Sequence, residues 1–311
     1  LGTTNATQTD TFYWTYDGEA PIITFSSTTQ GVVNGSVTSI QDISMAIEIS
    51  EVPLSFGQSD VAVTNGTISN FTGSGTDYTF DFSITSQGEA RVYIPEDNTI
   101  TDAANNVSVP YNDFIFTYDA TKPTVSISHA TLTSGSTSND SYIDLAINVS
   151  KKTNINTNSI IVTNGTKSNF TEGDNYQYSI RIFPKVGSDN TTITISIPSE
   201  NIADDGGLKN EDGAIFVWNY NNLIPTMTIS STISDGSIVN DASLAFTFLA
   251  SENITNFTTS SISLTNASIS NFDGSGSVYT AIVTPSSNGL VTLFIDNGKF
   301  QNSAGNENTD Y

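Results

Sequence analysis

Residues 63–79 read VTNGTISNFTGSGTDYT, and similar stretches recur at residues 162–178 (VTNGTKSNFTEGDNYQY) and 264–280 (LTNASISNFDGSGSVYT). Each stretch mixes β-branched and aromatic residues with turn signals such as Asn-Gly and Gly-Ser, a composition typical of short strands joined by tight turns. Three copies in one chain predict a repeat architecture with one structural unit per copy.

Two further elements recur in phase with these stretches. A proline opens a strand-like run in each unit, as PIITFSS, PTVSISH and PTMTISS, and an aromatic residue lies seven residues before each proline. Several elements in one order at one period do not arise from composition alone, so the chain is a tandem repeat. The prolines are Pro21, Pro123 and Pro225, spaced by 102 residues, and the aromatic residues are Trp14, Phe116 and Trp218.

Within a unit, alternating apolar runs are bounded by turn signals, and no sustained helical period is present. About six to eight short strands in roughly 100 residues predict an all-β fold of tandem immunoglobulin-like (Ig-like) β-sandwich domains. In the first unit we expect strands at Ile22–Ser26, Ile43–Ile49, Val61–Val63, Tyr78–Ile84, Ala90–Ile94 and Phe114–Tyr118.

The phase of the repeat gives the domain boundaries. We expect residues 1–18 to be the last strand of a preceding repeat, and residues 19–120, 121–222 and 223–311 to be repeats one to three. The third repeat is expected to lack its own last strand. Both ends then predict that the chain is part of a longer repeat protein.

Composition narrows the classes of function. Nine basic against 32 acidic residues give a net charge of −23, which disfavours nucleic acid and anionic membranes as partners. The chain has no cysteine, so disulfides, thiolate zinc sites and cysteine nucleophiles are excluded. No apolar stretch is long enough to span a membrane, and no targeting motif is evident.

The segments Thr117–Pro123 (TYDATKP) and Val63–Thr67 (VTNGT) make the resemblance specific. With the repeat around them, they resemble the bacterial Ig-like repeats of large surface adhesins, and the resemblance extends over the whole chain. It implies an extracellular or cell-surface stalk of stacked domains that is often stiffened by calcium. The second and third repeats depart from the pattern at its acidic positions.

In a seven-stranded Ig-like sandwich, the incoming linker and the B–C and F–G loops meet at one pole. At the first junction these segments carry carboxylates and amides, which suit the six to eight oxygen ligands of Ca²⁺. Alternatively, Asp and Asn are ordinary turn residues that recur in any repeat. The predicted ligands are Asp17, Glu19, Glu51, Asp102, Asn105 and Asn106.

The other two junctions are weaker candidates. The second offers Asp119, Asp204 and Asp205, but Lys151 stands where the first repeat has Glu51, and its ammonium group could replace a cation. The third is a poor site because Asn221 replaces the linker aspartate. Its remaining groups are Glu252, Asn302 and Asn306.

No catalytic residue is expected. A Ser-His-Asp triad would have to use His129, the single histidine, which we interpret as a strand-edge residue. Acidic clusters fall in turns that recur between repeats, whereas a catalytic pair would not normally be triplicated. Trp14 and Trp218 could stack on sugars, but their equivalence to Phe116 favours a core role. If the source organism glycosylates, Asn65, Asn70, Asn164 and Asn169 are candidate acceptors.

We therefore expect a non-catalytic stalk of an extracellular surface protein. Its partners would be neighbouring repeats or like subunits, with any cell-surface or glycan ligand bound by regions outside these residues. One alternative is a subunit of a filament or surface layer, joined by donor-strand pairing through residues Asp10–Tyr16. A weaker alternative is a carbohydrate-binding module, which requires an exposed aromatic platform.

Overall fold

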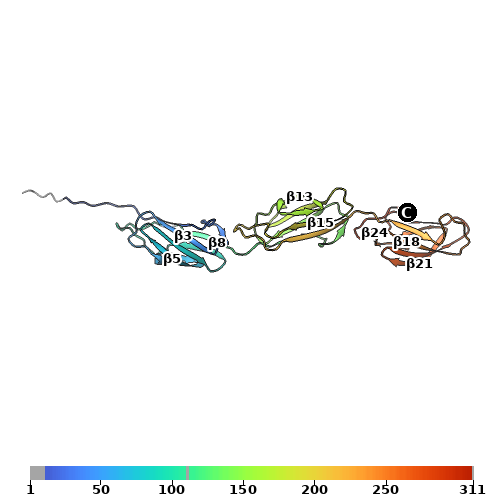
Figure 1. Cartoon of the computed structure of the whole chain (residues 1–311), viewed down its shortest axis with the longest axis horizontal. Coiled ribbons are helices and arrows are strands. Elements are labelled where there is room, and N and C mark those ends of the chain that lie inside the picture. Colours follow the sequence, from blue (N-terminus) through green and yellow to red (C-terminus); the bar gives the residue numbers. More distant parts are fainter. Residues whose placement is uncertain (1–10, 110–111, 310–311) are drawn as a thin grey trace, which may run out of the picture. The chain divides into compact units, whose positions relative to one another are not determined.

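The computed structural model describes residues 11–109 and 112–309 of the chain. The described residues form an all-β structure of Ig-like sandwiches in tandem (Figure 1). By contact density the chain divides into two compact units, Leu1–Lys122 with Ala203–Lys209, and Pro123–Ile202 with Asn210–Tyr311. The repeat boundaries expected at residues 19–120, 121–222 and 223–311 remain predictions.

The first sandwich lies in the first unit. One sheet has the order β1 (Ile23–Ser27), β3 (Asp42–Ile49), β6 (Asp77–Ile84) and β5 (Gly66–Ser74), all antiparallel. The facing sheet has the order β2 (Val37–Thr38), β8 (Phe114–Tyr118), β7 (Gly88–Tyr93) and β4 (Ala62–Thr64), in which β2 and β8 pair in parallel. A 3₁₀ turn at Gln58–Asp60 precedes β4.

The second sandwich repeats this plan. Its first sheet has the order β9 (Val125–His129), β11 (Ile143–Val149), β14 (Gln177–Pro184) and β13 (Gly165–Glu172). Its second sheet has the order β10 (Thr137–Ser138), β16 (Ala214–Asn221), β15 (Asn190–Ile197) and β12 (Ile161–Thr163). The 3₁₀ turn recurs at Thr157–Ser159.

The third sandwich keeps only one full sheet. That sheet has the order β17 (Met227–Ser231), β18 (Leu244–Ala250), β22 (Val278–Pro285) and β21 (Ala267–Ser275). Opposite it, β20 (Ser263–Thr265) pairs with β23 (Thr292–Phe294), and β19 (Ile254–Thr255) pairs with β24 (Gln301–Asn302). The 3₁₀ turn recurs at Thr259–Ser261. Within residues 112–309, no strand occupies the place that β8 and β16 hold in the first two sandwiches.

Each sandwich has its own hydrophobic core. Side chains alternate along the strands, so that in β3 every second residue from Ile43 to Ile49 is buried between the sheets. Phe116 is 1 % exposed and Trp218 is fully buried, which confirms the core role expected for Trp218, whereas Trp14 at the same place in the repeat is 77 % exposed. The indole Nε1 of Trp218 donates to the hydroxyl of Ser138 at 2.9 Å, so its polar atom is also satisfied.

The expected strands of the first repeat all form, with ends that shift by up to two residues. Sequence analysis missed β5, because its Asn, Gly and Ser residues suggest a turn. In the structure Asn65 and Asn70 take left-handed backbone angles, and the register of β5 against β6 shifts between Ser69 and Thr72. This bulge lets turn-type residues lie within a paired strand.

The segment before β1 differs from expectation. Residues 11–20 have no regular secondary structure, and Phe12, Trp14 and Tyr16 are 82 %, 77 % and 87 % exposed. Asp10 and the rest of residues 1–10 lie outside the described residues. The strand expected here does not form in residues 11–18, because a strand is not stable without a sheet to pair with.

Candidate functional site

Three of the six residues predicted at the first junction come together. One ligand oxygen from each of Asp17, Glu51 and Asp102 lies within 4.8 Å of the other two. Asp17 belongs to the segment before β1, Glu51 follows β3, and Asp102 lies in the loop after β7. A β-bridge between Pro53 and Asp102 brings the last two loops side by side. Within the described residues, no second group of acidic or histidine side chains meets the same distance criterion.

The loop that carries Asp102 is fixed by its own hydrogen bonds. One carboxylate oxygen of Asp102 accepts from the backbone amides of Ala104 and Asn106, each at 2.8 Å. Asn105 takes the left-handed backbone angle that closes the turn (φ 66°). The Asp102 side chain is therefore held in place while the residue is only 2 % exposed.

The other three predicted residues have supporting positions. The Asn106 side-chain amide donates to the second carboxylate oxygen of Asp102 at 2.8 Å and to the carbonyl oxygen of Asp17 at 3.2 Å, so it ties the linker to the loop. The backbone amide of Glu19 donates to Asp17 at 3.1 Å. Neither the carboxylate of Glu19 nor the amide of Asn105 belongs to the three-oxygen group.

The electrostatics of the cluster are unbalanced without a cation. Desolvation raises the pKa of Glu51 above its ordinary value of 4.5, and the negative charges of Asp102, Asp17 and Glu19 raise it further. Desolvation also acts to raise the pKa of Asp102, but the hydrogen bonds from Asn106 and Ala104 outweigh it and lower that pKa. A cation bound among these oxygens would remove the repulsion that falls on Glu51.

The third sandwich repeats this geometry with amides in place of carboxylates. Asn302 accepts from the amides of Ala304 and Asn306, as Asp102 does from Ala104 and Asn106. Its side-chain amide donates to the Glu252 carboxylate at 3.2 Å and to the linker carbonyl of Leu223 at 3.0 Å. In the third repeat, the NH₂ group of Asn302 therefore donates a hydrogen bond to the Glu252 carboxylate. In the first repeat, the carboxylate of Asp102 stands at that position and repels Glu51, and a cation would be needed to offset the repulsion.

The second repeat keeps the same turns. Asp204 accepts from the amides of Gly206 and Leu208 at 3.0 and 2.9 Å, and Asp119 accepts from the amide of Thr121 at 2.9 Å. The structure describes Asp119 and Asp204 in separate turns, and Asp205 is not part of the three-oxygen group. In sequence, Lys151 takes the place of Glu51.

Aligned by these turns, the three repeats carry three different sets of charge. The first set has three carboxylates, the second has two carboxylates and a lysine, and the third has one carboxylate and two amides. The sequence reveals the exchange of Asp for Asn, but not that the Asn302 amide contacts Glu252. The sets are Asp17, Glu51 and Asp102; then Asp119, Lys151 and Asp204; then Asn221, Glu252 and Asn302.

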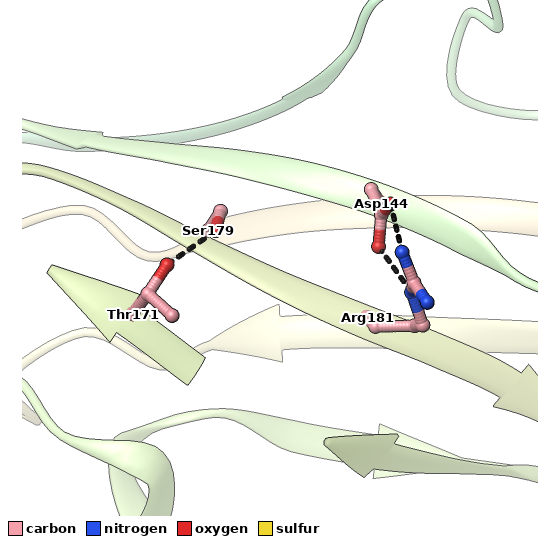
Figure 2. A network of polar contacts seen from close by, with 4 residues as sticks. All are labelled: Asp144, Thr171, Ser179 and Arg181. Atoms are coloured by element: carbon pink, nitrogen blue, oxygen red, sulfur yellow. Dashed lines mark hydrogen bonds and ion pairs between the residues drawn. The ribbon is translucent and has the colours of Figure 1, made fainter. Parts of the chain in front are cut away.

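The remaining candidate residues have structural contacts. Nδ1 of His129 accepts from the backbone amide of Leu132 at 2.9 Å, as a turn-capping residue does. Arg181 on β14 makes two 2.8 Å hydrogen bonds to Asp144 on β11, beside a Thr171–Ser179 contact (Figure 2). Arg181 lowers the pKa of Asp144 by this hydrogen-bonded pairing. The geometry is that of a cross-strand pair.

Of the four candidate glycan acceptors Asn65, Asn70, Asn164 and Asn169, the first three make side-chain hydrogen bonds. The side-chain nitrogen of Asn65 donates to the carbonyl oxygens of Ser86 and Glu89 at 2.7 and 3.2 Å. That of Asn70 donates to Asp81 at 2.7 Å, and that of Asn164 donates to Thr192 at 2.9 Å. A glycan on these nitrogens would disturb the contacts, so the geometry disfavours Asn65 and Asn164 in particular.

One repeat of this chain matches a known family. Residues 221–311 match the family described as the bacterial Ig-like domain. The match lies in the third sandwich and covers less than half of the chain. The family is non-catalytic, in agreement with the expectation that this chain is not an enzyme. No curated protein sequence matches the chain.

Solved structures of other Ig-like proteins are similar in outline. The adhesin FdeC of Escherichia coli is 12 % identical with a TM-score of 0.41, covering 94 % of this chain and 98 % of its own. InvD of Yersinia pseudotuberculosis is 13 % identical with a TM-score of 0.38 and coverages of 88 % and 81 %. Invasin, a bacterial integrin-binding protein, is 13 % identical with a TM-score of 0.35 and coverages of 88 % and 56 %. At these values, none of the three specifies a function for this chain.

No helix among the described residues has the length and apolar character needed to cross a membrane.

Proposed function

We propose that this chain is a non-catalytic stalk of an extracellular surface protein, and that its first repeat binds one Ca²⁺ ion where the incoming segment meets the domain. The observation that supports this most is the comparison of the three equivalent sites. The second set includes a lysine, and in the third the Asn302 amide donates to the single carboxylate, whereas the first gathers three carboxylates within 4.8 Å, of which only Asp102 accepts from an amide side chain, that of Asn106.

The ion would act as a cross-link. Asp17 lies in the segment before β1, and Glu51 and Asp102 lie in two loops of the sandwich. Shared coordination would hold that segment against the domain and oppose bending there. A site of a few carboxylates at a domain surface is typical of extracellular modules that bind Ca²⁺ with Kd of about 10⁻⁴–10⁻³ M. The bacterial Ig-like family of the third repeat supports the cell-surface location.

The first test is thermal unfolding by calorimetry, with Ca²⁺ or EGTA. A ligand present at 100 times its Kd stabilises the folded state by about 2.7 kcal/mol. For a domain near 100 residues, this raises the Tm of the first repeat by roughly 10–20 °C. Glu51→Ala should abolish most of the rise.

Two further variants sharpen this test. Glu252→Ala changes the equivalent position of the third repeat and should leave the calcium response intact. Glu51→Lys introduces the residue that the second repeat has at this position. Its ammonium group would offset the charges of Asp17 and Asp102, so the Tm in EGTA should rise and the response to Ca²⁺ should disappear. Equal Tm values of the unmodified chain in Ca²⁺ and EGTA would rule out the ion.

For the weaker alternative of a carbohydrate-binding module, the buried rings of Phe116 and Trp218 offer no platform, whereas the ring of Trp14 is 77 % exposed.

A further inference from the structure

A network of asparagine side chains joins the second and third sandwiches, which, apart from residues 203–209, lie in one compact unit. Strands β10 and β16 pair side by side in the second sandwich, and Asn139 follows β10 while Asn221 ends β16. The turn at residues 302–306 of the third sandwich contacts both of these strand ends. The second sandwich therefore presents a surface of two neighbouring strand ends, and its partner is a turn of the repeat that follows.

Asn306 is the centre of this network. Its side-chain oxygen accepts from the side-chain amide of Asn139 at 3.0 Å, and its side-chain nitrogen donates to the carbonyl oxygen of Asn221 at 2.8 Å. Beside it, the backbone amide of Asn139 donates to the carbonyl oxygen of Ala304 at 3.2 Å. Asn306 and Ala304 are each 6 % exposed. The desolvated amide group of Asn306 therefore finds these two partners only when the sandwiches keep this arrangement.

The connecting segment, residues 222–226, is tied to the same turn. The side-chain nitrogen of Asn302 donates to the carbonyl oxygen of Leu223 at 3.0 Å and to the carboxylate of Glu252 at 3.2 Å. The side-chain oxygen of Asn302 accepts from two backbone amides of the turn. A primary amide can make all these contacts without an ion, because it carries both a donor and an acceptor.

The pair of Asn139 and Asn306 is particular to this place in the chain. The first sandwich has Ser39 where the second has Asn139, and the second has Leu208 where the third has Asn306. The turns fix this alignment, since the backbone amides of Leu208 and Asn306 each donate to the side chain that opens their turn. The amides are thus concentrated between the second and third sandwiches, where the carboxylate set of the first repeat is missing.

We propose that this asparagine network locks the second and third sandwiches into one rigid pair without a bound cation. A turn that is held at two neighbouring strand ends cannot rotate about either contact alone, so the network opposes both bending and twisting of the linker. Calcium would then control bending only where the segment before β1 meets the first sandwich. The lock goes beyond the proposed calcium site and does not depend on it.

Double electron–electron resonance on the whole chain tests the lock. The chain has no native cysteine, so spin labels at Ser126→Cys and Thr228→Cys report only the distance between the two sandwiches. Both residues are exposed, and they hold equivalent positions on β9 and β17. We expect one narrow distance distribution that is the same in Ca²⁺ and in EGTA. A broad distribution, or one that narrows when Ca²⁺ is added, would overturn the lock.

Alanine variants test the contacts themselves. Asn139→Ala should lower the ratio of docked to undocked sandwiches by roughly 2–10-fold, and the double variant Asn139→Ala/Asn306→Ala by roughly 10–100-fold, so that the distribution broadens. Asn139 is exposed, so its replacement leaves the second sandwich folded. Asp140→Asn alters the next exposed residue and is the matched control, which should leave the distribution unchanged. An unchanged distribution in the double variant would contradict the proposal.

Exchanging amides for carboxylates separates the lock from the proposed calcium site. With Glu252, the double variant Asn221→Asp/Asn302→Asp gives the third repeat the three carboxylates of the first, and it keeps the oxygens that accept from backbone amides. In EGTA, loss of the Asn302 donor and repulsion from Glu252 should broaden the distribution. A distribution that stays narrow in EGTA would count against the lock. Broadening that Ca²⁺ does not reverse would support the lock and count against the carboxylate set as a calcium site.

Discussion

At the scale of single residues, the carboxylates of the first repeat predict that its folding stability depends on pH. The raised pKa of Glu51 means that its protonated form stabilises the metal-free fold below pH 4.5, and that this contribution is lost as pH rises through the raised folded-state value. Asp102 acts in the opposite direction. Its contribution to folding stability is present above pH 3.8, the ordinary pKa of an aspartate, and is lost as the pH falls through the lowered pKa of Asp102 in the folded state.

The proposed calcium ion would compete with the proton on Glu51. We therefore expect the Tm rise caused by a fixed Ca²⁺ concentration to shrink as pH is lowered from 7 towards 4.5, while Asp102 remains ionised. Glu51→Gln should show a smaller rise at pH 7 that does not shrink over the same interval. An equal calcium effect at pH 7 and 4.5 in the unmodified chain would contradict this role of Glu51.

Asn65 illustrates a residue whose role is structural. It holds φ at 59°, and its side chain contacts Ser86 and Glu89. Asn65→Gly should lose the hydrogen bonds and cost about 1–2 kcal/mol, whereas Asn65→Ala adds left-handed strain and should cost roughly 2–3 kcal/mol.

Urea unfolding followed by circular dichroism measures both variants. Thr67→Ala is the control, because it destroys the Asn65-Gly-Thr sequon at an exposed position and leaves the contacts of Asn65 in place. A loss of stability in Thr67→Ala as large as in Asn65→Ala would point away from the side-chain contacts.

At the scale of elements, the last strand of each sandwich holds its second sheet together. In the second sandwich β16 pairs with β15 on one side and, in parallel, with β10 on the other. The buried contact between Trp218 and Ser138 joins β16 to β10. Replacing Trp218 by Phe, the residue at this place in the first repeat, removes the contact and leaves a small cavity.

We expect Trp218→Phe to lower the free energy of unfolding of the second repeat by about 1–3 kcal/mol. The double variant Trp218→Phe/Ser138→Ala should recover part of the loss, because no buried hydroxyl is then left without its partner. Urea unfolding gives both values. An additive effect of the two substitutions would show that the hydrogen bond contributes nothing.

At the scale of the whole molecule, the three hydrophobic cores share no residue. Stability in such a chain is mainly the sum of local domain terms, so substitutions in one repeat should leave the others folded. This property makes the matched comparison of Glu51 with Glu252 possible within one chain. It also allows the same three-residue site to carry a different charge in each repeat.

The sequence by itself determined the repeat period, the all-β sandwich class and the core position of Phe116 and Trp218, because side-chain alternation and turn chemistry are local properties. Only the tertiary structure decided that Asp17, Glu51 and Asp102 meet, while Glu19 and Asn105 stay outside the group. Their approach depends on how two distant loops pair at the Pro53–Asp102 bridge.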